Sequence, residues 1–276
     1  MNYAQIKGFN YQPSYGRNGL ELWRNFDADV IETELERGKR CFPHMNAIRL
    51  WLSWDAFTYA DDSGREQFCE NFDTALAIAE GFGLRVMPVL YNRWHNWFLD
   101  YGGLYIDHFL PASWGGAWAG RRFDERCRTY VEAVVGPHAE DPRVMAWDLC
   151  NEPFSYNDMS RAPAQRLFKA EYDWLVSQHE LCKEIGASAP LTVGAHWGTP
   201  IEEQAPISDV LSIHPYWNYG DDKAKYEAHL DADVAFAQEV GKPLIATETC
   251  WGSLDDEKRV EISEYTQGQL KERRIA

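Results

Sequence analysis

The sequence has no apolar run long enough to cross a membrane and no apolar N-terminal segment of the kind that directs secretion. We therefore expect no membrane partner. We expect a cytoplasmic protein, or a secreted one whose leader has been removed. No cluster of basic residues stands out either, and the formal net charge is −16. This balance argues against nucleic acid as a partner.

Cysteine pairs with C-x-x-C spacing are also absent, as are internal repeats, linkers and low-complexity segments. Isolated cysteines are typical of free thiols in a reducing compartment. A chain of 276 residues with 45% hydrophobic content is long enough to bury one sizeable core, so we predict a single domain over 1–276. The sequence does not predict an oligomeric state. The cysteines are Cys41, Cys69, Cys127, Cys150, Cys182 and Cys250.

Short apolar runs alternate with longer segments of helical spacing, which predicts βα units and a parallel sheet. The fold class expected is α/β, a (β/α)8 barrel, whose sites lie at the carboxyl ends of the strands. An eighth strand is apparently missing, so either the chain is truncated or the barrel is open there. Strands are predicted at 6–11, 46–53, 84–91, 143–149, 191–195, 210–213 and 243–247, and helices at 29–39, 66–82, 123–135, 163–185, 222–240 and 255–273.

Two of the predicted strands end in a glutamate. Glu152 follows Asn151 at the end of the fourth strand, and Glu248 follows the seventh. Because the carboxyl ends of barrel strands meet at one rim, we expect the two carboxyl groups to lie close together. Glycoside hydrolysis typically requires a pair of carboxyl groups. The acid of such a pair needs a raised pKa, and the nucleophile must stay ionised.

Other polar and aromatic residues accompany this pair. Arg49 stands inside an apolar strand, where an arginine must be paired, either as a structural salt bridge or as part of the site. The fifth strand ends at His196 and the sixth at His214, with Tyr216 two residues further on. A long loop over 92–121 is rich in aromatic residues, whose rings suit sugar faces but also pack loops down. The aromatic substrate-binding candidates are Trp54, Trp94, Trp197, Trp217 and Trp251.

These motifs together resemble family 5 of the clan A retaining glycoside hydrolases, the cellulase and mannanase family. The resemblance implies that Glu152 is the acid/base, Glu248 the nucleophile and Asn151 the residue that holds the sugar 2-hydroxyl. It also implies that Arg49 and Tyr216 hold the nucleophile and that His214 lines the pocket. The motifs are Gly8-Phe9-Asn10-Tyr11, Ile48-Arg49-Leu50-Trp51, Asn151-Glu152-Pro153, His214-Pro215-Tyr216 and Thr247-Glu248.

Two departures from the family pattern are visible. The family places a histidine near the end of strand three, where this chain has Tyr91-Asn92, and His95 is the stand-in we predict. The family also places a tryptophan on strand eight, for which Trp251 is the partial replacement. We predict a retaining β-glycoside hydrolase that cleaves β-linked oligo- or polysaccharides of glucan or mannan type, with a carbohydrate as partner and no metal or cofactor.

Two other functions remain open at this point. One is a non-catalytic carbohydrate-binding barrel, made inert by the missing strand. The other is a metal-dependent sugar isomerase or hydrolase barrel, because Glu152, His196, His214 and Glu248 are nitrogen and oxygen ligands of the kind that metal ions bind. The sequence leaves the sugar, the linkage and the choice between exo and endo action undetermined.

Overall fold

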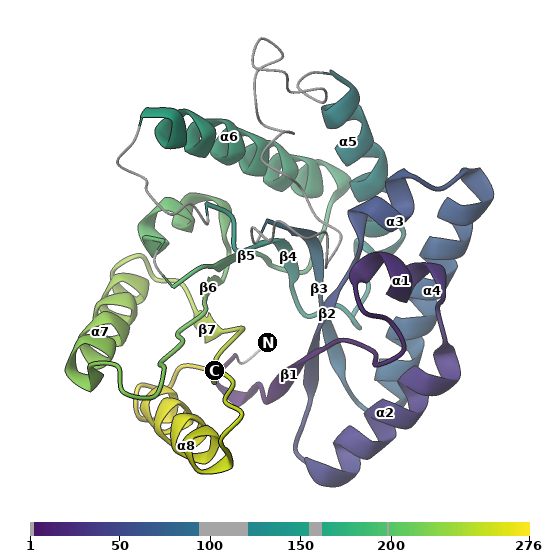
Figure 1. Ribbon diagram of the computed structural model, residues 1–276. Helices are drawn as coiled ribbons and strands as arrows, with labels where there is room; N and C mark the ends of the chain where they lie inside the picture. The colour runs from purple at the N-terminus through teal and green to yellow at the C-terminus, as the bar shows by residue number, and fades with distance from the viewer. Residues whose placement is uncertain (1–2, 94–120, 155–161, 198) are drawn as a thin grey trace.

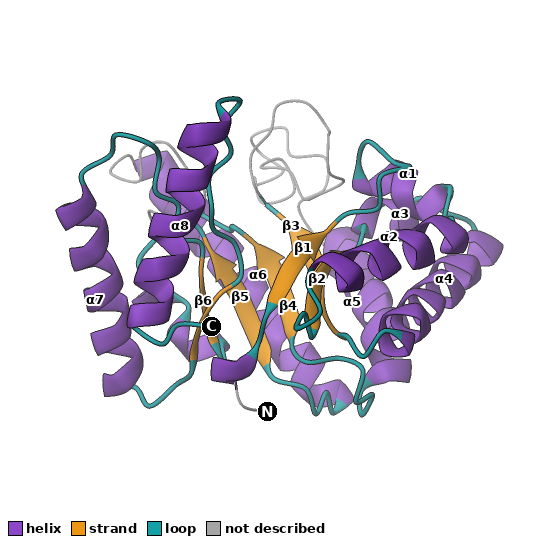
Figure 2. Ribbon diagram, turned by 90° about the horizontal axis from the view of Figure 1, so that it is seen from below, coloured by secondary structure: helices purple, strands orange, loops and turns teal. Residues whose placement is uncertain are grey.

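The computed structural model describes residues 3–93, 121–154, 162–197 and 199–276. Seven parallel strands form one sheet in chain order, and each strand pairs with its neighbours in sequence. The sheet is curled and the helices lie along its outer side (Figures 1 and 2). This confirms the parallel α/β architecture. The strands are β1 (Gly8–Tyr11), β2 (Ala47–Trp51), β3 (Arg85–Asn92), β4 (Trp147–Asn151), β5 (Leu191–Ala195), β6 (Leu211–Ile213) and β7 (Leu244–Ala246).

Aspartate side chains begin several helices. Asp27, Asp61, Asp222 and Asp255 each accept a hydrogen bond from a backbone N–H of the first helical turn. Such caps satisfy donors that have no partner within the helix. The α-helices are α1 (Gly19–Arg24), α2 (Ala28–Cys41), α3 (Trp54–Thr58), α4 (Asp62–Gly81), α5 (Arg121–Val135), α6 (Ala162–Ile185), α7 (Lys223–Glu239) and α8 (Asp256–Glu272). Short 3-10 helices lie at Tyr3–Gln5, Gly136–His138, Ile201–Glu203 and Ala205–Ile207.

The structure departs from the predicted elements in several places, and α4, for example, begins at Asp62 rather than at 66. Helices α1 and α3 were not predicted, because each is too short to give a helical repeat. Strand β4 begins at Trp147 rather than at 143. The backbone N–H groups of Arg143 and Val144 both donate to Asp141, at 2.9 and 3.2 Å, so the chain turns just before the strand. Only Val144 forms an isolated bridge, to Val86 of β3.

The sheet is a curled half-barrel in which β1 pairs only with β2 and β7 only with β6. One side-chain hydrogen bond joins these edges: the Asn10 side chain donates to the Thr247 carbonyl at 2.8 Å. On the β7 side, the Ala246 N–H donates to the carbonyl of Ala276, the last residue of the sequence, at 2.7 Å. Among the residues described, none forms an eighth strand. The carboxyl ends of β1 and β7 are therefore linked by a side chain.

Apolar side chains fill the space between sheet and helices in two main clusters. The larger one joins β2 to β5 with helices α1 to α6, and the smaller one joins β6 and β7 with α7 and α8. Both strands that end in the predicted glutamates thus rest on packed helices. Within the described part of the chain, no helix has the length and apolar character that a membrane span needs.

Candidate active site

Strand β4 contains a bulge that sets the direction of its last side chains. The pairing of β4 with β5 shifts register between Asp148 and Asn151. Regular alternation would put Asp148 and Cys150 on one face. Instead, Cys150 packs into the larger apolar cluster, and Asp148 and Asn151 both reach Arg49 of β2. A bulge re-aims side chains in this way.

The Arg49 guanidinium is the centre of the polar network. It is 4% exposed and donates to four side chains. Its Nε and Nη2 reach Asp148 Oδ2 at 3.0 and 2.7 Å, and Nη2 also reaches Asn151 Oδ1 at 2.8 Å. Its Nη1 lies 3.0 Å from Asn10 Oδ1 and 2.5 Å from Glu248 Oε1. The buried arginine is thus paired, as predicted, and it joins strands β1, β2 and β4 to Glu248.

Glu152 follows the bulge in the left-handed region, with φ 46°. A non-glycine residue there is strained, and such strain occurs where surrounding contacts fix the backbone. The Glu152 N–H donates to the Gly194 carbonyl of β5 at 2.8 Å. The side chain is nearly buried, and its Oε1 lies 2.7 Å from Nδ1 of His214. The other ring nitrogen of His214 lies 3.0 Å from the Thr247 hydroxyl, so the imidazole has a hydrogen-bond partner at each end.

Glu248 has donors on several sides. Besides Arg49, the Tyr216 hydroxyl donates to its Oε2 at 2.8 Å, and Nδ1 of His214 lies 3.6 Å from the same oxygen. Burial raises the pKa of Glu248, but His214, Arg49 and the Tyr216 hydroxyl outweigh it, so the pKa lies below its usual value. Glu248 is therefore ionised at neutral pH. Burial and the Glu248 charge raise the pKa of Tyr216, which stays a donor.

The two glutamates face the same cavity. One carboxylate oxygen of each, together with a ring nitrogen of His214, all lie within 4.8 Å of one another. The cavity has a volume of about 660 Å³, enough for a sugar-sized ligand. It is lined by Asn10, Tyr11, Gln12, Trp51, Asn92, Asn151, Glu152, His196, Tyr216, Glu248, Thr249, Cys250, Trp251 and Gly252.

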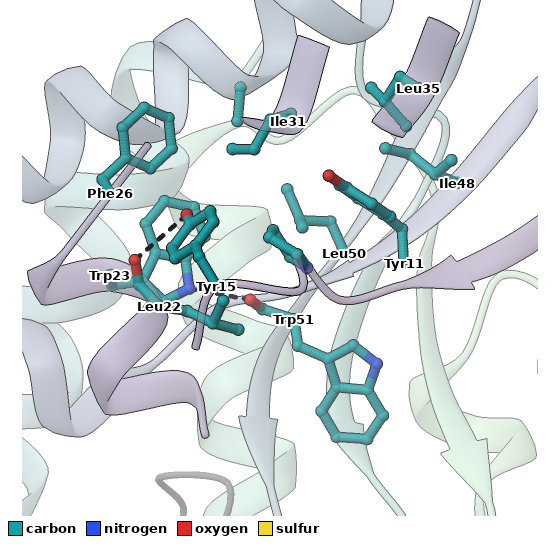
Figure 3. Close-up of a pocket in the computed structure, with 12 residues that line it drawn as sticks. Tyr11, Tyr15, Leu22, Trp23, Phe26, Ile31, Leu35, Ile48, Leu50 and Trp51 are labelled. Carbon is teal, nitrogen blue, oxygen red and sulfur yellow. Dashed lines mark hydrogen bonds between the residues drawn. The ribbon is translucent and has the colours of Figure 1, made fainter. Parts of the chain in front are cut away.

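A second, apolar cavity of about 10 Å³ lies behind Tyr11 and Trp51, which line both spaces (Figure 3). The Trp23 Nε1 donates to the Trp51 carbonyl at 2.9 Å, as one dashed line in Figure 3 marks. The Tyr11 hydroxyl donates to Glu34 at 2.8 Å. A space of this size admits one water at most, so it cannot take a sugar. Tyr11 and Trp51 form the wall between the core and the larger cavity.

Two side-chain groups in the described residues have a spacing that suits a metal ion. One is Glu152, His214 and Glu248, where the Arg49 guanidinium already supplies a positive charge to Glu248. The other is Asp73, His138 and Asp141. There the Nη2 of Arg143 lies 2.6 Å from an oxygen of each aspartate and takes the place a cation would occupy.

The predicted tryptophans separate into different environments. Trp251 is 48% exposed, lines the larger cavity and meets Tyr216 edge to face at 5.3 Å. Trp54 and Trp217 do not line it, because each is buried, in α3 and against α8 respectively. Trp197 stacks on His229 at 4.0 Å and is likewise not among the lining residues. Trp94 and His95 lie outside the described residues.

Several residues of the site were not predicted as site residues, although Asn10 and Trp51 lie within the motifs that carry the resemblance to family 5. Asn10 and Asp148 hold Arg49, and Trp51 lines the cavity with its ring 4.9 Å from the Arg49 guanidinium. A signal for Asp148 was present. It is an acid inside an apolar strand, and Arg49 is a base inside another, so each supplies the partner that the other requires. Asn10 gives no such signal, because an asparagine at a strand end is common.

No family model matches the chain. It is 24% identical over 185 residues to a probable mannan endo-1,4-beta-mannosidase A-1 of Aspergillus terreus, which covers 63% of this chain and 45% of that protein. A mannan endo-1,4-beta-mannosidase A of Hypocrea jecorina is 24% identical over 212 residues, or 75% of this chain and 41% of that protein. The chain therefore spans less than half the length of these curated relatives.

Among solved structures, the endo-1,4-beta-mannanase of Rhizomucor miehei superposes with a TM-score of 0.68 at 17% identity, covering 99% of this chain and 88% of that one. These comparisons confirm the resemblance to the family 5 glycoside hydrolases of clan A. The curated relatives are enzymes that act on O-glycosyl bonds of mannan, and the solved structure shares the fold. The chain is thus similar to glycoside hydrolases, and the two curated relatives above are mannanases.

Proposed function

We propose that the chain is a retaining β-glycoside hydrolase that cleaves β-linked mannan-type oligo- or polysaccharides. The observation that carries the proposal is the approach of Glu152 and Glu248, with one oxygen of each within 4.8 Å, at one cavity. Retaining enzymes hold their two carboxyl groups about 5 to 5.5 Å apart, whereas inverting enzymes leave about 6.5 to 9.5 Å for a water. The short separation in this site favours retention. The mannan preference rests on the curated relatives.

In the first step, the Glu248 carboxylate attacks the anomeric carbon while Glu152 gives its proton to the leaving glycosidic oxygen. The ionised state of Glu248 supports its role as the nucleophile. Arg49 and Tyr216 donate to its two oxygens and hold one face of the carboxylate toward the cavity. The product of this step is a glycosyl ester on Glu248, and the aglycone leaves with the proton.

In the second step, Glu152 takes a proton from water as that water attacks the anomeric carbon, and the ester bond to Glu248 breaks. The hydrogen bond between His214 and Glu152 orients the Glu152 carboxyl group. Asn151 stands beside Glu152 at the end of β4 and lines the cavity, a position from which its amide donates to a sugar hydroxyl. The exposed ring of Trp251 offers an apolar face to the substrate.

The test is to assay the protein on β-linked polysaccharides and aryl β-glycosides, and to compare Glu152→Ala and Glu248→Ala. Each variant should lose at least about 10³-fold in kcat. Azide should rescue both: Glu152→Ala should give the β-glycosyl azide, whereas Glu248→Ala should give the α-anomer. Glu66→Gln, in α4, is the control and should keep full activity. An α-anomer as the first product of the intact enzyme would contradict the proposal.

We also propose that residues 1–276 form a single barrel that is open between β7 and β1. The support is the side-chain link from Asn10 to Thr247 in place of strand pairing, and the exposure of Gly8 to Asn10. Amide hydrogen exchange tests this directly. The amides of β1 and β7 should exchange faster than those of β4, which is paired on both sides. Equal protection across all seven strands would contradict an open edge.

A further inference from the structure

Asp148 is a fully buried carboxylate that does not line the cavity. Its Oδ2 accepts from Nε and Nη2 of Arg49, and its Oδ1 accepts from the Gly194 N–H at 3.1 Å. A buried carboxylate is retained only when charged and hydrogen-bonding partners compensate for the loss of water. Both oxygens are satisfied here, and the partner of one of them is the arginine that contacts Glu248.

The backbone at Gly194 lies close to the guanidinium. A Cβ built on Gly194 would lie 3.0 Å from Arg49 Nη2, 3.2 Å from Asp148 Oδ2 and 2.9 Å from His214 Nε2. The backbone of β5 thus closes one side of the network. The two bonds that Arg49 donates to Asp148 fix the plane of the guanidinium, which points Nη1 at Glu248.

We propose that Asp148 is a positioning residue, which orients Arg49 toward Glu248 and takes up part of its positive charge. Without this second carboxylate, the whole field of Arg49 would act on Glu248. A nucleophile that binds its counter-ion too strongly is held back from the anomeric carbon. Asp148 leaves Glu248 ionised but weakly enough paired to react. This inference rests on the proposed role of Glu248 as the nucleophile.

Four groups face Glu248, and they come from three segments of the chain. Arg49 projects from β2, His214 and Tyr216 follow β6, and the Glu152 carboxyl group lies at the end of β4. Asp148 acts on Glu248 from behind Arg49. Neutralising Asp148 removes a negative charge and should lower the pKa of Glu248. Adding a negative charge on the other side of Arg49 should raise it.

The experiment uses two variants that change the charge in opposite senses. Asp148→Asn keeps the shape of the side chain, and Asn10→Asp places a carboxylate next to Nη1 of Arg49 at an exposed position. The pKa of Glu248 is read from the carbonyl resonance of ¹³C-labelled glutamate, assigned by its absence in Glu248→Gln. Asp148→Asn should lower that pKa and Asn10→Asp should raise it, each by about 1 unit.

The apparent pKa of the acidic limb in the pH profile of kcat/KM should shift in the same directions. Asp148→Asn should also lose about 10- to 100-fold in kcat at pH 7. Asp141→Asn is the matched control, because it removes another arginine-paired aspartate, bound to Arg143. It should lower the melting temperature and leave the Glu248 titration unchanged. An unchanged Glu248 titration in Asn10→Asp and Asp148→Asn overturns the inference.

The two proposals fail in different ways. Absence of turnover by the intact protein on every β-glycoside would refute the proposed function, while the ¹³C titration would still decide the charge sharing. If Asp148→Asn does not fold, Asp148→Glu decides, because it keeps the charge but moves it relative to Arg49. A shifted Glu248 pKa with lowered kcat supports the inference, and an unchanged pKa and kcat refute it.

Discussion

Replacing Asp233 by asparagine should stabilise the protein, and only above mildly acidic pH. Asp233 lies on α7 and is 6% exposed. Burial, and then the charge of Glu202, raise its pKa to about 7 from the usual 3.8. The nearest base is His229, whose Nε2 lies 3.8 Å from the Asp233 carboxylate. Burial lowers the pKa of His229, so that ring is neutral at pH 7 and offers the carboxylate no ion pair.

The direction of the change in stability with pH follows from proton binding. Between pH 3.8 and about 7 the folded protein keeps a proton on Asp233 that the unfolded chain releases, so stability falls as pH rises through that interval. At about 1.4 kcal/mol per pH unit, the upper bound of this loss is about 4 kcal/mol. Because water reaches part of the site, we expect Asp233→Asn to gain about 1 to 3 kcal/mol at pH 8.

The assay is urea denaturation of the wild type and Asp233→Asn at pH 4 and pH 8. At pH 4 the carboxyl group is protonated in the folded protein, so the two free energies of unfolding should agree within about 0.5 kcal/mol. At pH 8 the variant should be the more stable one. Glu239→Gln, at the exposed end of the same helix, is the control for a change of net charge. A difference that is the same at both pH values would refute the reasoning.

Two further predictions concern the cavity and the alternative metal site. Trp251→Ala should raise KM about 10-fold with little change in kcat, because we propose that its exposed ring packs against the substrate, whereas Trp217→Ala should lower the melting temperature instead. Equal effects of the two substitutions on KM would contradict this. Activity should survive dialysis against a strong chelator, because Arg49 supplies the positive charge beside Glu248. A loss that Zn²⁺ or Mn²⁺ restores would favour a metal-dependent reaction.

The alternation of apolar runs and helical segments was enough to predict the seven strands in their order. The periods of apolar residues in helices and strands reflect which side chains are buried. A parallel sheet with short connections then allows few other strand orders. Glu152 and Glu248 could be selected for the same reason, since both follow predicted strands. The buried Arg49 could be recognised as paired, because the interior of a sheet does not hold an isolated charge.

The tertiary structure decided which side chains face the cavity. The bulge in β4 depends on the register with β5, and it turns Asn151 toward Arg49 while Cys150 packs outward. Asp148, one of the side chains paired with Arg49, is 99 residues away in the sequence, so only the curl of the sheet brings the two together.

Which tryptophans reach the cavity was also decided by the tertiary structure rather than by the sequence. Their spacing does not separate Trp251 at the cavity from Trp54 and Trp217 in the core. Local sequence thus determines the elements and the residues at their ends. Register and curvature, which arise from contacts between distant strands, determine which of those residues meet.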